Sequence, residues 1–254
     1  VASRLRPGAG VLILEPRGGL DVVAALALGA RAVTAVEVNP LVVAAVGYPY
    51  DNPHVRVVFD SDRSYLRRTE ARFDLIELSL ASSYHPVRSG AYSLAEDYRN
   101  TVESFQDALG RLAPDGLLVV TRWLQDPPSE ELRAFALAVT ALERRGADPR
   151  SQIVAWRGYN TATLLVKNGA FAPDELQAVR AFAADRAFDL IYAPDIRPEE
   201  TNRYNILPVS IYSRAFTGLL DSPSRRDFYA AYPYDISPPT DDHPFFGHYF
   251  KWSQ

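Results

Sequence analysis

The residues with the clearest chemical potential lie between positions 11 and 40, where two glycines and a later acid follow two apolar runs. Gly18 and Gly19 come shortly after the run Val11–Leu14, and Glu37 ends the second run. Small residues at the end of a buried strand let a ligand approach backbone amides. An acid at the end of the next strand can accept two hydrogen bonds from a ribose diol. We therefore expect a site for an adenosine-containing cofactor.

The elements that position these residues form a predicted βαβ unit. A strand over 11–14 leads through the glycine turn into an alanine-rich helix, and a second strand ends at Glu37. Apolar residues fill nearly every strand position, which is typical of parallel strands covered by helices on both faces. The turn lacks the G-x-G-x-x-G pattern of nicotinamide dinucleotide sites, so that class of cofactor is disfavoured.

Further candidates follow the other predicted strands, because ligands bind at the carboxyl ends of parallel strands. Asn39 follows the second strand, and Asp60 and Asp62 follow a third strand over 55–59. Ser79 follows a fourth strand over 73–78, in which Glu77 shares a face with it. Asp60 has a second interpretation, as the cap of a helix over 62–69.

The apolar spacing over residues 1–169 predicts seven strands in all, with an antiparallel edge. A long amphipathic helix is expected from Leu94 to Leu112, with Tyr98 in its core stripe. The later elements are a turn at 114–116, a strand over 117–123, a helix that Ser129 caps, an antiparallel pair over 153–156 and 161–166, and a helix-rich remainder with one strand over 188–192. This division predicts a domain over 1–169 and an α-rich extension over 170–254.

Composition sets broad limits on function. The chain has 254 residues, 47% hydrophobic and 23% charged, with a net charge of -4, so it is an ordinary globular protein and a poor partner for nucleic acid. Cysteine is absent, which excludes disulfides and thiol chemistry. Methionine is absent even at position 1, so we expect an excised or processed chain. No apolar run reaches the ~18 residues of a membrane span.

Several phrases of the sequence resemble one family. They are GGLDV at 18–22, VEVNP at 36–40, DRSYL at 62–66, FDLI at 73–76, PDG at 114–116 and PTDDHPFF at 239–246. Together they resemble the spermidine synthase-like branch, that is the polyamine aminopropyltransferase-like branch, of the class I S-adenosylmethionine-dependent methyltransferase fold. The resemblance is to a bacterial subgroup that is often embedded in multi-spanning membrane proteins.

This resemblance implies an α/β fold: a Rossmann-like sheet of seven strands with helices on both faces. It implies a transferase that uses S-adenosylmethionine or its decarboxylated form on a small amine-bearing substrate, in the cytoplasm. Membrane contact would come only through flanking segments absent from this sequence. A homodimer is a further expectation, and no metal site is expected, because the spacing around Asp241, Asp242 and His243 suits none.

The resemblance also implies roles for the candidate residues. Glu37 would hold the ribose, and Asp60 or Asp62 the adenine. Family members carry glycines where this chain has Glu15 and Arg17, so a positive φ at Arg17 would be strained by ~1 kcal/mol or more. An alternative alignment keeps Gly19 and places Glu15 near the ammonium group of the cofactor.

The catalytic position departs from the family. Aminopropyltransferases place an Asp after the fourth strand to take a proton from the amine, whereas this chain has Ser79, a poor base without a partner. Glu77 is therefore either hydrogen-bonded to structural donors, or a replacement base or amine anchor. Substrate contacts are expected from Tyr84, His85 and Tyr92 in a loop.

These departures leave a second hypothesis open. A degenerate, non-catalytic domain that senses a ligand or mediates assembly in a membrane protein would tolerate Ser79 and Arg17. It would also tolerate the absence of the N-terminal β-domain that aminopropyltransferases use. The arginines at 63, 67, 68 and 72 are expected to form a solvated basic edge of a helix.

Overall fold

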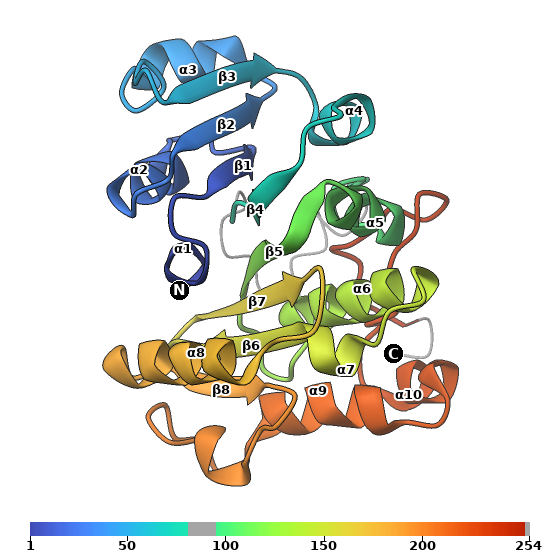
Figure 1. Ribbon diagram of the computed structural model, residues 1–254. Helices are drawn as coiled ribbons and strands as arrows, with labels where there is room; N and C mark the ends of the chain where they lie inside the picture. Colours follow the sequence, from blue (N-terminus) through green and yellow to red (C-terminus); the bar gives the residue numbers. More distant parts are fainter. Residues whose placement is uncertain (81–94, 252–254) are drawn as a thin grey trace. The chain divides into compact units, whose positions relative to one another are not determined.

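The computed structural model describes residues 1–80 and 95–251, and its strands and helices are labelled in Figure 1. The chain divides into two compact units. Unit 1 comprises Val1–Ser82, Asp107–Val120 and Leu165–Ala170, and unit 2 comprises Ser83–Gln106, Thr121–Leu164 and Phe171–Gln254. The predicted boundary at residue 169 remains a prediction.

Unit 1 contains a parallel sheet in the order β3-β2-β1-β4-β5. Its elements are α1 (Ala2–Leu5), β1 (Gly10–Leu14), α2 (Leu20–Ala27), β2 (Ala32–Glu37), α3 (Pro40–Val46), β3 (Val55–Phe59), α4 (Asp62–Arg68), β4 (Phe73–Leu78) and most of β5 (Leu112–Trp123). Strand β1 lies between β2 and β4, with Leu12 opposite Thr34 and Ile76. Its apolar side chains are almost completely buried, which is why the sequence shows them as one continuous run.

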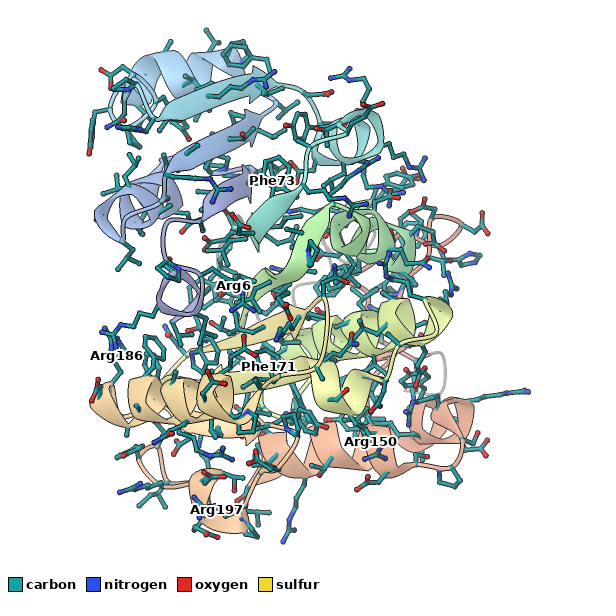
Figure 2. The ribbon with its side chains drawn as sticks, viewed as in Figure 1. Arg6, Phe73, Arg150, Phe171, Arg186 and Arg197 are labelled. Carbon is teal, nitrogen blue, oxygen red and sulfur yellow. The ribbon has the colours of Figure 1, made fainter. Side chains whose placement is uncertain are left out.

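Strand β5 begins earlier than predicted and includes Pro114, Asp115 and Gly116, which were expected to form a turn before the strand. The pairing of β4 with β5 shifts register between Phe73 and Leu75, so the extra residues form an irregularity inside the strand. A Cβ at Gly116 would lie 3.0 Å from the carbonyl oxygens of both Ala113 and Phe73, so a side chain there would crowd the backbone. Phe73 is labelled in Figure 2, where β4 begins. The expected turn is therefore wrong.

The long helix predicted from Leu94 is also wrong. Helix α5 runs only over Val102–Gly110, and Tyr98 is 46% exposed rather than part of a core stripe. Just before the helix, the Asp97 carboxylate accepts hydrogen bonds from the backbone N–H groups of Arg99 and Asn100 at 3.2 Å. Such local bonds give the backbone an alternative to a helical turn. Leu94 falls outside the described residues.

Unit 2 contains the end of β5, followed by β7, β6 and β8. Its elements are α6 (Glu130–Arg144), α7 (Pro149–Gln152), β6 (Ile153–Arg157), β7 (Thr161–Lys167), α8 (Pro173–Asp185), β8 (Asp189–Tyr192), the 3-10 helix Pro198–Glu200, α9 (Ile211–Asp221) and α10 (Arg225–Ala231). Because β8 pairs antiparallel with β6, the sheet has eight strands where seven were expected. Helices α6 and α9 meet through the stacked rings of Phe135 and Phe216, 4.3 Å apart.

A buried ion pair fixes the loop after β8. Asp189 is fully buried and accepts hydrogen bonds from the backbone N–H groups of Arg203, Tyr204 and Asn205 at 2.7 to 2.9 Å. The guanidinium of Arg157, 4% exposed, lies 3.2 Å from the same carboxylate. Every oxygen of this carboxylate has a partner, so the pair is structural.

The basic edge of α4 is ion-paired rather than free in solvent. Arg63 and Arg67 lie 3.2 and 3.1 Å from Asp107, and Arg68 pairs with Asp60. Arg72 donates to the carbonyl oxygens of Gly110 and Leu112.

Ser129 precedes α6 as expected, but its hydroxyl makes no capping hydrogen bond. Across residues 1–80 and 95–251, no helix combines the length and apolar character that a membrane crossing requires.

Candidate cofactor site

The turn between β1 and α2 has an unusual backbone conformation. Glu15, Arg17 and Gly19 have φ values of 51°, 46° and 77°, all in the left-handed region that favours glycine. Two of these positions are not glycine, and each such residue is strained by ~1 kcal/mol or more. Arg17 thus meets the condition under which the sequence predicted strain.

The two glycines of the turn have different surroundings. A Cβ at Gly19 would lie 2.7 Å from Cδ of Pro49, so close packing excludes any side chain there. A Cβ at Gly18 would meet nothing within 4 Å. Gly19 is therefore required by the fold of unit 1, whereas Gly18 leaves open space beside the backbone of the turn.

Glu37 and Tyr50 each form a hydrogen bond with the backbone of the strained residue Arg17. Glu37 is 3% exposed, and its carboxylate accepts hydrogen bonds from the backbone N–H groups of Arg17 and Asn39, each at 3.1 Å. The Tyr50 hydroxyl donates to the carbonyl oxygen of Arg17 at 2.5 Å. The backbone of Arg17 is thus fixed at its donor and its acceptor, which keeps a non-glycine residue in a left-handed conformation.

The other strand-end residues lie where the sequence predicted them. Asn39 caps α3, because its side-chain oxygen accepts from the N–H group of Leu41 at 3.0 Å. Asp60 accepts from the N–H group of Ser61 and from Arg68. Ser61, not Asp60, caps α4. Asp62 is the first residue of α4 and is 5% exposed.

Glu77 is an acid without a hydrogen-bond donor among the described residues. It lies near the carboxyl end of β4, between Ile13 of β1 and Val119 of β5. Burial raises the pKa of its carboxyl to about 8, with a further contribution from the Asp21 carboxylate. In the described part of the chain, no donor lies within hydrogen-bonding distance of it. The expectation that structural donors hold Glu77 therefore finds no support in these residues.

Ser79 lies just beyond the end of β4. Its hydroxyl is buried and finds no hydrogen-bond partner among the residues that the structure describes. A serine needs a partner base to act as a nucleophile or a proton acceptor. Ser79 can therefore donate a hydrogen bond at this site, but nothing described here makes it a base.

The site is electrostatically negative. Burial raises the pKa of the Tyr50 hydroxyl to about 12, and the carboxylates of Glu37 and Asp21 contribute to this shift. The carboxylate of Asp21 raises the pKa of both Tyr50 and Glu77, so these three side chains lie in one region of unit 1. Positive charge comes from Arg17, whose exposed guanidinium lies 3.5 Å from Glu15, and from the N-terminal amino group, which lowers the pKa of Glu77. A cationic ligand suits this surrounding better than an anionic one.

Some predicted site residues cannot be placed. Tyr84, His85 and Tyr92 lie in residues 81–94, outside the described part of the chain, and remain predictions. Asp241, considered above as a metal ligand, accepts from the Thr101 hydroxyl at 2.7 Å, and its N–H group donates to Glu103 at 3.0 Å. Sequence reasoning missed Tyr50 and Asp21. The sequence marks Asp21 as the first acid after the glycines, but no feature of the sequence points to Tyr50.

Comparison with known proteins settles the fold. No family model and no curated protein matches the chain. A spermidine synthase crystallised with the transition-state analogue AdoDATO is 18% identical over 85% of this chain and 70% of that chain, with a TM-score of 0.52. The chain has the spermidine synthase-like, class I methyltransferase fold.

Two other solved structures are similar with lower TM-scores. A spermidine synthase from Thermotoga maritima is 17% identical over 84% of this chain and 66% of that chain, with a TM-score of 0.47. The N-methyltransferase NodS from Bradyrhizobium japonicum is 16% identical over 66% of this chain and 90% of that chain, with a TM-score of 0.45. The fold predicted from the sequence phrases is confirmed by the first comparison, and these two likenesses carry no further argument.

Proposed function

We propose that the chain is a transferase that binds S-adenosylmethionine or its decarboxylated form at the glycine turn and acts on a small amine. The observation that carries this proposal is the carboxylate of Glu77. It lies near a strand end of a class I methyltransferase fold and has no hydrogen-bond donor among the described residues. A desolvated acid without a structural partner, at the edge where ligands bind, is a candidate for function.

The residues present fit an adenosyl sulfonium ligand. Gly18 leaves open space beside the turn, and Glu15 and Asp21 supply negative charge for a cationic sulfur or ammonium group. Glu77 adds a negative charge once it loses its proton. When bound, the sulfonium supplies a carbon group for transfer to a nucleophile. Glu37 would orient the ribose, since each of its oxygens retains a lone pair after bonding the backbone. Asp60 or Asp62 would meet the adenine.

In this proposal Glu77 moves the proton of the amine. An amine attacks only as its neutral form, so a base must accept or hold a proton during transfer. A carboxyl with a pKa of about 8 is a far better proton acceptor near neutral pH than an ordinary glutamate. Ser79 would donate a hydrogen bond beside it, and Tyr84, His85 and Tyr92 would line the amine site.

A calorimetric titration of the purified chain tests the binding step. The ligands are S-adenosylmethionine, decarboxylated S-adenosylmethionine and the neutral methylthioadenosine. We expect a cationic ligand to bind more tightly than the neutral one, and Glu37→Ala to weaken binding while the chain stays folded. Absence of binding by all three at millimolar concentration would contradict the proposal and leave the non-catalytic hypothesis.

A further inference from the structure

Two charged residues of the glycine turn, Glu15 and Arg17, form an ion pair at positions where the resembled family carries glycines. The guanidinium of Arg17 lies 3.5 Å from the carboxylate of Glu15, and the two side chains are 58% and 30% exposed, respectively. Both residues have left-handed backbones, with φ values of 46° at Arg17 and 51° at Glu15. Strain of this kind persists only where the surrounding structure imposes it, and it clusters at sites that bind ligands. Both side chains are therefore candidates for ligand contact.

The backbone of each residue is fixed, while the side chains face solvent. The N–H group of Glu15 donates to the carbonyl oxygen of Val36 at 2.9 Å. The N–H group of Arg17 donates to Glu37, and its carbonyl oxygen accepts from Tyr50. The contact between the two side chains, at 3.5 Å, is at the long limit for a hydrogen bond. A guanidinium has five N–H donors, so this contact leaves Arg17 with donors for a ligand.

An acid and a base that lie side by side are complementary to an α-amino acid. That group carries an ammonium and a carboxylate on one carbon atom, so the acid can bind the ammonium while the base binds the carboxylate. S-adenosylmethionine ends in such a group. Its decarboxylated form keeps the ammonium but lacks the carboxylate, and so has one more net positive charge. The charges at the turn therefore distinguish the two ligands.

We infer that Glu15 and Arg17 together bind the α-amino acid end of the ligand, so that the site selects intact S-adenosylmethionine over its decarboxylated form. The inference rests on the proposed function, because it concerns the same site. Glu15 contacts the ammonium that both ligands share, and Arg17 contacts the carboxylate that only the intact ligand has. With the decarboxylated form, the guanidinium would face additional positive charge and find no acceptor.

This selection decides which group is transferred. With S-adenosylmethionine bound, the neutral nitrogen of the acceptor amine bonds to the methyl carbon while the bond from that carbon to sulfur breaks. The electron pair of the broken bond stays on sulfur, and Glu77 takes the proton that the nitrogen releases. The product is a methylated amine rather than an aminopropylated one.

Calorimetric titration with both ligands tests the inference. The parent chain should bind S-adenosylmethionine ~tenfold more tightly than the decarboxylated form. Arg17→Gln should lower the affinity for S-adenosylmethionine by ~tenfold without lowering the affinity for the decarboxylated form, so the preference disappears. Glu15→Gln should lower both affinities by a similar factor, so the preference persists. Circular dichroism verifies that each variant folds.

The matched control is Arg31→Gln, which removes a guanidinium of similar exposure, 62%, just before the amino end of β2. It should change neither affinity. If Arg17 only repels cationic ligands, Arg17→Gln would raise both affinities, which would overturn the inference. A parent chain that binds the decarboxylated form at least as tightly would also overturn it and leave the proposed function standing. Binding of neither ligand at millimolar concentration would overturn both.

Discussion

Two acids in the two units of this protein contrast sharply. Asp189 in unit 2 is completely buried, yet three backbone N–H groups and Arg157 surround its carboxylate. Glu77 in unit 1 is partly exposed, yet no described donor reaches it and burial raises its pKa to about 8. Burial alone therefore does not distinguish Asp189, a structural acid, from Glu77, the acid that we propose to be functional. The two carboxylates differ in their described donors, and the predictions for Asp189 and Glu77 below test that difference.

The largest effect is expected at Asp189. Asp189→Ala would leave the Arg157 charge buried without a counterion and three N–H groups without an acceptor, so the free energy of unfolding should fall by ~3–5 kcal/mol. Urea denaturation measures it. The control is Asp195→Ala, whose exposed ion pair with Arg180 should contribute less than ~1 kcal/mol. Similar losses in both variants would contradict the structural role of Asp189.

Substitution of Glu77 should stabilise the chain at high pH, whereas substitution of Asp189 should destabilise it. Its folded pKa of about 8 lies above the unfolded value, so between about pH 4.5 and about pH 8 the folded state binds more protons. Stability should therefore fall as pH rises through that range, and this slope should disappear in Glu77→Gln. Above about pH 8 the variant should be more stable than the parent by roughly 2–4 kcal/mol.

The control for Glu77 is Glu70→Gln, which changes an exposed acid. It should change the free energy of unfolding little, as expected of a surface substitution. If Glu77→Gln is less stable than the parent at every pH, the carboxylate has structural donors and the contrast with Asp189 fails.

The hydroxyl of Tyr50 should stabilise the turn between β1 and α2. Tyr50→Phe removes the donor to the Arg17 carbonyl oxygen, and we expect the free energy of unfolding to fall by ~1 kcal/mol. Ligand affinity should fall with it, because the turn loses one of its two fixed points. Tyr48→Phe, at a 60% exposed tyrosine, is the control and should change neither quantity. Equal effects of the two variants would show that the hydrogen bond does not hold the turn.

The smallest effect is expected at Arg17. Arg17→Gly relieves the left-handed strain and should raise the free energy of unfolding by roughly 0.5–1 kcal/mol, measured by urea denaturation. Arg17→Ala removes the same guanidinium but keeps the strain, so it should give no gain. If both variants gain equally, the charge of Arg17 and not its backbone is unfavourable.

The sequence predicted the strands of unit 1 well because buried parallel strands are continuous apolar runs. Val11–Leu14 and Phe73–Leu78 match β1 and β4 to within one residue, and Glu37 ends β2 as expected. The predicted helix from Leu94 failed because Asp97 bonds the following backbone, which apolar spacing does not reveal. Strand β8 joined the sheet through long-range pairing with β6, which also leaves no local signal.

The candidate site was predictable only in part. The strain at Glu15 and Arg17 could be anticipated, because the family resemblance places glycines there. The role of Tyr50 could not, since it lies 33 residues after Arg17 and contacts only its backbone. The lack of described donors around Glu77 depends on β1 and β5, the two strands that flank β4, so the sequence left its role open.

The most direct test is the affinity for S-adenosylmethionine as a function of pH, measured by calorimetry for the parent chain and for Glu77→Gln. Between about pH 6 and about pH 9 the parent should gain affinity as Glu77 loses its proton and attracts the cationic ligand. Glu77→Gln should lack that gain, and neutral methylthioadenosine should show none with either protein. The same pH profile for the parent and the variant would contradict the claim that Glu77 belongs to the ligand site.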